Sequence, residues 1–292
     1  MAKAPRLPFQ ALKACARGVL LALCLLPAGK VAFACDGFPP RDLPERSAMF
    51  VQPNGVSQEL VTRYPDLKNT DVVWHVEFFG ETNRYAHNIM GRLRDATGLV
   101  LWRGYANGMI NCPLVHILDA DHVFEDLAPR LADITGDGRP EIVTVRSNTT
   151  RGAQLVVYDQ YLKRLAETPY IGRRNRWLSV IGIADLDQDG SQEIAYIDRP
   201  HLAKTLMIWR YKAPGQLVKV AEKEGLTNHR IGWDYLVGGV RDCEGAPEVL
   251  VSNGDWTQIQ GIRLNKDGLT QQGYDIVPTI NGFRRALSCD QR

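Results

Sequence analysis

Short apolar runs rich in Val and Ile alternate with turn residues along most of the chain. They occur in pairs, 142–145 with 154–158, 194–197 with 205–211, and 249–252 with 257–264, and polar turns follow at 159–160, 213–215 and 266–268. Runs of this kind between Gly, Pro, Asp and Asn are typical of β-strands joined by hairpins. Because only 57–64 has a spacing that fits a short helix, we predict an all-β protein.

The same short acidic segment precedes the first two pairs of runs. Segments 131–143 and 183–195 align without a gap, so that Asp133 and Asp185, 52 residues apart, begin the same Asp-x-x-x-Asp-Gly-x-x-Glu pattern. A third, weaker copy at 239–250 keeps the Gly and the Glu followed by an aliphatic residue, but it has lost the Asp series. A period of about 50 residues with three or four strands per unit is typical of β-propeller blades.

The repeat divides the chain into predicted blades. Full blades are expected at 122–171, 172–226 and 227–278, and a degenerate one at about 72–121. The remaining segments 35–71 and 279–292 together have the length of one more repeat. We therefore predict a five-bladed propeller closed by strands from both termini, with four or six blades as the alternatives. Closure of this kind hides the edge strands that a linear array would expose.

Residues 1–34 have the pattern of a secretory signal peptide. They carry five basic side chains and no acid, an apolar stretch from 18 to 29, and Ala32-Phe33-Ala34 before Cys35. The apolar stretch is shorter than the roughly 20 residues that span a bilayer. We expect cleavage after Ala34, a periplasmic or secreted product, and a single mature domain at 35–292 with no membrane span.

The leader also accounts for the positive charge of the whole chain. The 292 residues carry 35 Lys and Arg against 33 Asp and Glu. Without the leader, 258 residues remain with 30 basic and 33 acidic side chains, a net charge of −3. No excess of cations is left to displace counterions from phosphates, so a nucleic-acid partner is not expected. We expect a monomer.

The acidic segment that leads into a strand resembles the FG-GAP (or VCBS) repeat of integrin-alpha-like propellers. The two strong copies with their flanking strands cover about 100 residues, and the chain as a whole is similar to exported bacterial FG-GAP repeat proteins. The resemblance implies a β-propeller with calcium in its blade loops. It implies no particular activity, because propellers of this kind serve adhesion, catalysis and accessory roles.

Alternating residues of a tight loop can direct oxygen atoms at one calcium ion, which takes six to eight of them. The predicted ligands are Asp185, Asp187, Asp189, the Ser191 carbonyl and Glu193 in one loop, and Asp133, Thr135, Asp137, the Arg139 carbonyl and Glu141 in the other. Thr135 replaces a carboxylate of the family pattern, so the site at 133–141 should bind more weakly. The ions, one or two, are expected to be structural. Solvated Asp-Gly turns without metal are the alternative.

Four cysteines remain after the leader, and an even number in an exported protein favours disulfides. Of the three possible connectivities we prefer Cys243–Cys289, which ties the last full blade to the closing segment, with Cys35–Cys112 holding the N-terminus. Free buried thiols are the alternative.

Polar clusters at 172–177, 199–204 and 228–230 occupy loops between strands or blades. Propeller loops at equivalent positions gather on one face, so these clusters are expected to line a basic funnel for an anionic small molecule or glycan. The candidate ligand-binding residues are Arg176, His201, Lys204, His229 and Arg230. The chain is thus interpreted as a binding or interaction module for an unidentified protein or anionic ligand.

The competing interpretations stay open at this point. An enzyme, a hydrolase or lyase with its site around Arg176, His201 and His229, is the main alternative, and cations that merely pair with acids or face solvent are another. Segment 116–122 contains two His and two Asp; it fits either a transition-metal site or an ordinary loop.

Overall fold

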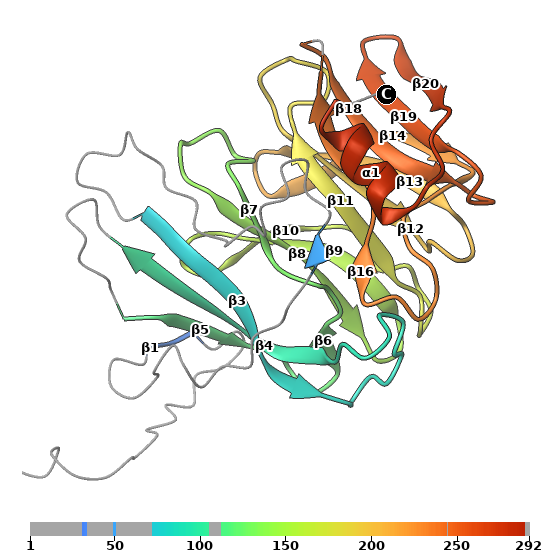
Figure 1. Ribbon diagram of the computed structural model, residues 1–292. Coiled ribbons are helices and arrows are strands. Elements are labelled where there is room, and N and C mark those ends of the chain that lie inside the picture. The colour runs from blue at the N-terminus through green and yellow to red at the C-terminus, as the bar shows by residue number, and fades with distance from the viewer. Residues whose placement is uncertain (1–30, 34–48, 51–71, 105–111, 244, 290–292) are drawn as a thin grey trace, which may run out of the picture.

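The computed structural model describes residues 31–33, 49–50, 72–104, 112–243 and 245–289 (Figure 1). The strands in these ranges are β1 (Val31–Phe33), β2 (Met49–Phe50), β3 (Val72–Thr82), β4 (Asp95–Gly104), β5 (Leu114–Ile117), β6 (His122–Phe124), β7 (Arg130–Ala132), β8 (Glu141–Asn148), β9 (Gly152–Tyr158), β10 (Arg164–Glu167), β11 (Leu178–Ala184), β12 (Glu193–Asp198), β13 (Thr205–Lys212), β14 (Gln216–Glu224), β15 (Leu226–Thr227), β16 (Tyr235–Leu236), β17 (Gly239–Asp242), β18 (Pro247–Asn253), β19 (Ile259–Asn265) and β20 (Gly268–Tyr274). One helix, α1 (Ile280–Leu287), follows them. The all-β prediction is confirmed.

Three groups of four strands follow one another, each antiparallel and paired in chain order. They are β7 to β10, β11 to β14, and β17 to β20. Each group lies inside one of the units at 122–171, 172–226 and 227–278 that the repeat predicted. The repeated sequence therefore corresponds to a repeated group of four strands, because hairpins of this length form from neighbouring residues, and the first group is part of a larger sheet.

The groups pack face to face in the same order, and successive residues of their second strands serve opposite faces. In β12, Ile194 and Tyr196 pack with the β7–β10 group, whereas Ala195 and Ile197 pack with the β17–β20 group. This follows from the two-residue period of a strand. It also explains why the inner strands β8 and β9 are buried along their whole length.

The N-terminal part continues the first of these sheets. β3, β4 and β5 pair antiparallel, β4 also pairs with β6, and β6 pairs with β8, so that one curled sheet runs from β1 to β10 (Figure 1). β1 pairs antiparallel with β5 and lies inside the predicted leader. The short helix considered at 57–64 falls outside the described residues.

The C-terminal segment is a helix, so the prediction of a closing strand at 279–292 was wrong for its described part. The Thr279 side chain caps α1 by accepting a hydrogen bond from the Gly282 N–H. Phe283, Ala286 and Leu287 recur at helical spacing and are buried against the outer face of the last sheet. The helix places these residues on one side, whereas in a strand the neighbours Ala286 and Leu287 would point to opposite faces.

The disulfide between Cys243 and Cys289 is confirmed and joins the loop after β17 to the end of α1. Cys112 is also disulfide-bonded. Cys35 lies outside the described residues, and the pairing Cys35–Cys112 stays a prediction. No helix in the described ranges has the length and apolar character needed to cross a membrane.

Candidate functional site

The two strong acidic loops, loop 1 (133–141) and loop 2 (185–193), fold in the same way around their first aspartate. The Asp133 carboxylate accepts hydrogen bonds from the N–H groups of Gly136 and Gly138 at 2.8 and 2.9 Å. The Asp185 carboxylate accepts from those of Asp189 and Gly190 at 3.0 and 2.9 Å. Gly190 has a φ of +91°, a conformation that a residue with a Cβ rarely adopts.

The other predicted ligands extend this pattern. Asp137 and Asp189 each accept a hydrogen bond from the N–H two residues later, on Arg139 and Ser191. The terminal glutamates, which open β8 and β12, accept from N–H groups near the start of their own loop. The Thr135 hydroxyl donates to Glu141 at 3.3 Å. The carboxylates therefore turn inward as the metal hypothesis requires, although Asp-Gly turns alone also produce such bonds.

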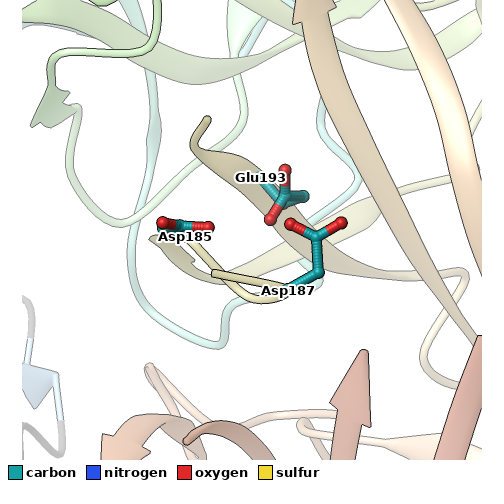
Figure 2. A group of neighbouring side chains, drawn as sticks. All are labelled: Asp185, Asp187 and Glu193. Atoms are coloured by element: carbon teal, nitrogen blue, oxygen red, sulfur yellow. The ribbon is translucent and has the colours of Figure 1, made fainter. Parts of the chain in front are cut away.

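Three carboxylates of loop 2 converge closely enough to hold a cation. Asp185, Asp187 and Glu193 each offer an oxygen within 4.8 Å of the other two, and Figure 2 shows them arranged around one point beside β12. No second group of this kind occurs in the part of the chain that the structure describes. One oxygen of Asp187, Oδ1, is buried without a hydrogen-bond partner. This donor set suits a hard divalent ion such as calcium.

Arg210 of β13 already supplies positive charge to loop 2. Its guanidinium donates to Asp187 at 2.7 Å, to Asp189 at 2.8 Å and to Glu193 at 2.5 Å. The contact arises from strand register, because Glu193 and Arg210 are paired residues of β12 and β13. Burial raises the pKa of Glu193, and the hydrogen bonds from Leu186 and Arg210 oppose that rise.

Loop 1 has no equivalent of this arginine. Asp159, directly after the partner of Ile142 in β9, stands where loop 2 has Arg210. Among the described residues Glu141 forms no ion pair, and burial raises its pKa to about 7 against the hydrogen bonds from Thr135 and Ile134. The two loops thus differ in charge compensation as well as at Thr135, the residue from which the sequence predicted weaker binding in loop 1.

The third repeat replaces the acidic loop by a buried ion pair. Glu248 accepts hydrogen bonds from Arg241 at 2.9 and 2.7 Å and from the Tyr274 hydroxyl at 2.8 Å. Arg241 also donates to the Ala286 carbonyl near the end of α1 at 2.6 Å. The repeated glutamate therefore serves here to fasten the helix.

A second cluster of side chains lies where hairpin loops within a group of strands meet the loops that lead into the next group. Backbone hydrogen bonds join these segments: Ala153 to Arg176, Arg199 to Trp177, and Gly254 to Gly225. The result brings four of the five predicted ligand-binding residues close together. Arg176 is different, because its guanidinium donates to the neighbouring Asn175 carbonyl and its own carbonyl accepts from Ala153.

His201 and His229 form the centre of this cluster. His229 Nε2 lies 2.9 Å from the Trp233 carbonyl, which can only accept, so this nitrogen carries the proton. His229 Nδ1 must then accept from His201 Nε2, 3.0 Å away. Burial, with a smaller contribution from His201 and against the hydrogen bond to Trp233, lowers the pKa of His229 to about 4. Both imidazoles are therefore neutral at pH 7.

Cations and aromatic rings continue the cluster outward. The exposed Arg230 guanidinium lies 4.6 Å from the ring centre of Trp256 and 5.6 Å from that of Trp233. Lys204 donates to the Gly254 carbonyl in the hairpin that carries Trp256. These contacts hold two positive groups beside partly exposed aromatic faces.

Sequence reasoning missed a carboxylate–imidazole pair beside these residues. His87 Nδ1 lies 2.5 Å from Glu125 Oε1, and Ser147 donates to the other oxygen of this fully buried carboxylate. Trp177, whose ring packs at 5.2 Å from that of His229, donates to the Glu125 carbonyl at 2.8 Å. Burial lowers the pKa of His201, the hydrogen bond with His229 opposes this, and His87 and Lys204 add smaller lowering effects. No spacing motif could have revealed this pair, since its members come from separate loops.

Asn228 adds a polar side chain without hydrogen-bond partners beside His229. It precedes His229, is fully buried, and neither its amide oxygen nor its amide nitrogen has a hydrogen-bond partner. Buried amides are normally satisfied, so this one points to a group that the protein alone does not supply.

The comparisons with known proteins do not name a family. No family model matches the chain, and no curated protein matches it at a significant level.

Proposed function

We propose that this protein is an exported, FG-GAP-like β-propeller that binds an anionic ligand at the cluster of His201, Lys204, His229 and Arg230. The proposal extends the observed sheets to a closed ring, and the stacking of three four-stranded groups in chain order supports it. It also takes 35–292 as one monomeric domain, released after export by cleavage of the signal peptide after Ala34.

The observation that carries the binding role is the chemistry of the cluster. Hydrogen-bonding imidazoles, two cations and partly exposed rings meet there from separate loops, and within the described residues no carboxylate pairs with His201, His229 or Arg230. An arginine without an acid partner recognises carboxylates and phosphates well. An acid–base pair on these histidines would instead have favoured the enzyme.

Calcium in this proposal is structural. Loop 2 has the donor set for it, with loop 1 as a weaker second site. Extracellular calcium modules have dissociation constants of about 0.1 to 1 mM, so that roughly 1 mM calcium stabilises a site by at most about 1.4 kcal/mol. A contribution of that size holds a loop but does not by itself drive a function.

Titration calorimetry with oligogalacturonate and with inorganic phosphate tests the binding role, with an uncharged cello-oligosaccharide as the control ligand. We expect binding of an anionic probe that weakens with salt and is lost in Arg230→Gln and His201→Gln. Arg173→Gln, in an exposed neighbouring loop, is the matched control and should bind normally. Equal binding by all variants, or none by the unaltered protein, contradicts the assignment.

A further inference from the structure

A second constellation lies outside the proposed binding cluster, on the connections around β6, β8 and β9. Asp121, His122 and Tyr170 form a continuous hydrogen-bonded chain: His122 Nδ1 lies 2.6 Å from Asp121 Oδ1, and His122 Nε2 lies 2.7 Å from the Tyr170 hydroxyl. His122 belongs to the segment 116–122 that stood out in the sequence. Its other histidine, His116, packs instead against Phe124 and Tyr158.

Two contacts fix the direction of the protons in this chain. The Asn148 amide nitrogen donates to Asp121 at 2.9 Å and approaches His122 Nε2 at 3.3 Å, so this imidazole nitrogen is an acceptor. His122 Nδ1 then donates to Asp121, and the Tyr170 hydroxyl donates to His122 Nε2. A hydroxyl aimed at an imidazole that a carboxylate orients is the arrangement of a nucleophile with its general base.

The backbone around the three side chains holds them in place. The Asn148 carboxamide oxygen accepts from the N–H groups of Thr150 and Arg151, and Thr149 donates to the Asp121 carbonyl. After Tyr170, the Ile171 N–H donates to the Ala153 carbonyl of β9, and the Gly172 N–H donates to the Arg151 carbonyl in the turn before β9. At Gly152 a Cβ would come within 2.2 Å of the Arg173 carbonyl, so only glycine allows the two segments to approach this closely.

Two arginines give the tyrosine a positive environment. The exposed Arg151 guanidinium lies 3.9 Å from the Tyr170 ring centre, and it forms no ion pair with another described residue. The buried Arg146 donates to Gln154 and Glu167, and its Nε has no hydrogen-bond partner. Burial raises the pKa of Tyr170, and Arg146 and Arg151 oppose that rise. Because 59% of the Asp121 side chain is exposed, the hydrogen-bonded chain of Asp121, His122 and Tyr170 reaches solvent at this end.

We propose that Tyr170, His122 and Asp121 form a catalytic centre for the hydrolysis of phosphate monoesters. A guanidinium group over the Tyr170 ring favours a substrate whose negative charge sits on the reacting group itself, which is the case for a phosphoryl group. Arg151 binds the phosphoryl oxygens, Tyr170 is the nucleophile, His122 is the base and Asp121 positions His122.

The reaction balances without any further reactant except water. The Tyr170 oxygen forms a bond to phosphorus as the bond to the leaving oxygen breaks, and the tyrosine proton passes through His122 Nε2 to the leaving group. Water then attacks the phosphotyrosine and gives a proton to His122. His122 returns that proton to the tyrosine oxygen, and inorganic phosphate leaves.

The test is hydrolysis of p-nitrophenyl phosphate by the purified protein, followed by release of p-nitrophenol. Tyr170→Phe and His122→Gln should lower kcat/KM by about 100-fold or more, the usual contribution of a catalytic acid or base. Arg151→Gln should mainly raise KM. Tyr161→Phe, at an exposed tyrosine in the β9–β10 turn, is the matched control and should retain activity.

A second measurement separates nucleophilic from merely structural roles. After rapid acid quenching, mass spectrometry should find a phosphoryl group on the Tyr170 peptide of the unaltered protein. Asp121→Asn should shift the pH profile of kcat as well as lower its maximum. Absence of turnover in the folded, unaltered protein, or turnover that Tyr170→Phe leaves unchanged, overturns the proposal.

Discussion

Arg210→Gln tests whether calcium can replace the Arg210 guanidinium as the positive charge in loop 2. The substitution removes the guanidinium that contacts Asp187, Asp189 and Glu193 and leaves a shorter, uncharged amide. Glu193 is fully buried, so its bond to Arg210 carries most of the effect. Loss of one partner from a buried ion pair costs about 3–5 kcal/mol, and since 22% of the Arg210 side chain is exposed we expect about 3 kcal/mol without calcium.

Calcium should reverse part of this loss. At roughly 1 mM calcium the unaltered loop gains at most about 1.4 kcal/mol, and a tenfold tighter site in the variant would gain about 2.7 kcal/mol. Urea unfolding in calcium and in EDTA measures both quantities. Arg263→Gln is the matched control, because Arg263 contacts Glu248 in the repeat that lacks the Asp series. The reasoning would be refuted by an Arg210→Gln variant that loses the same free energy in both conditions.

Three further predictions concern the stability of the fold. Because the buried His229 has a pKa lowered to about 4, only the unfolded chain takes up this proton between about pH 6.5 and 4. Stability should therefore fall by up to about 3 kcal/mol as the pH drops through that window, and His229→Gln should flatten the slope in urea titrations. Replacing Cys243 and Cys289 by Ser opens a loop with a sequence separation of 46 and should cost about 4 kcal/mol, whereas an unchanged urea midpoint would contradict the disulfide's role. Thr279→Ala should cost about 1 kcal/mol and speed amide exchange in α1, and Thr279→Ser should restore both.

The acidic loops illustrate what local sequence contains. The turn around Asp185 is made by N–H groups four and five residues away, so a nine-residue pattern is enough to predict it. The Arg210 contact needs the register of β12 against β13, which brings together residues 17 apart. A hairpin register was within reach of sequence reasoning, but nothing in the spacing distinguishes Arg210 from an arginine that faces solvent.

The sequence of the C-terminal helix contains helical signals, but the prediction gave more weight to the length of the segment. Thr279, a favourable N-cap, is followed by Ile280, Phe283 and Leu287 at helical spacing. The prediction of a closing strand rested on the total length of the terminal segments, which says nothing about local conformation. Burial of the apolar face against β17 and β18 decided the outcome.

By itself, the sequence determined the all-β class, the three repeated groups of strands, the turns of the acidic loops and one disulfide. The strands and turns depend on residue periodicity and turn chemistry, which act over short stretches of sequence. The disulfide could be predicted because four cysteines allow only three connectivities. Only the tertiary structure decided that His87 meets Glu125, that His201 meets His229, and that Tyr170 reaches His122. Those pairs lie 38, 28 and 48 residues apart. The first and last of these contacts depend on the curl of one long sheet, and the His201–His229 contact depends on how two sheets pack. Both are set by burial summed over the whole core rather than by any local pattern.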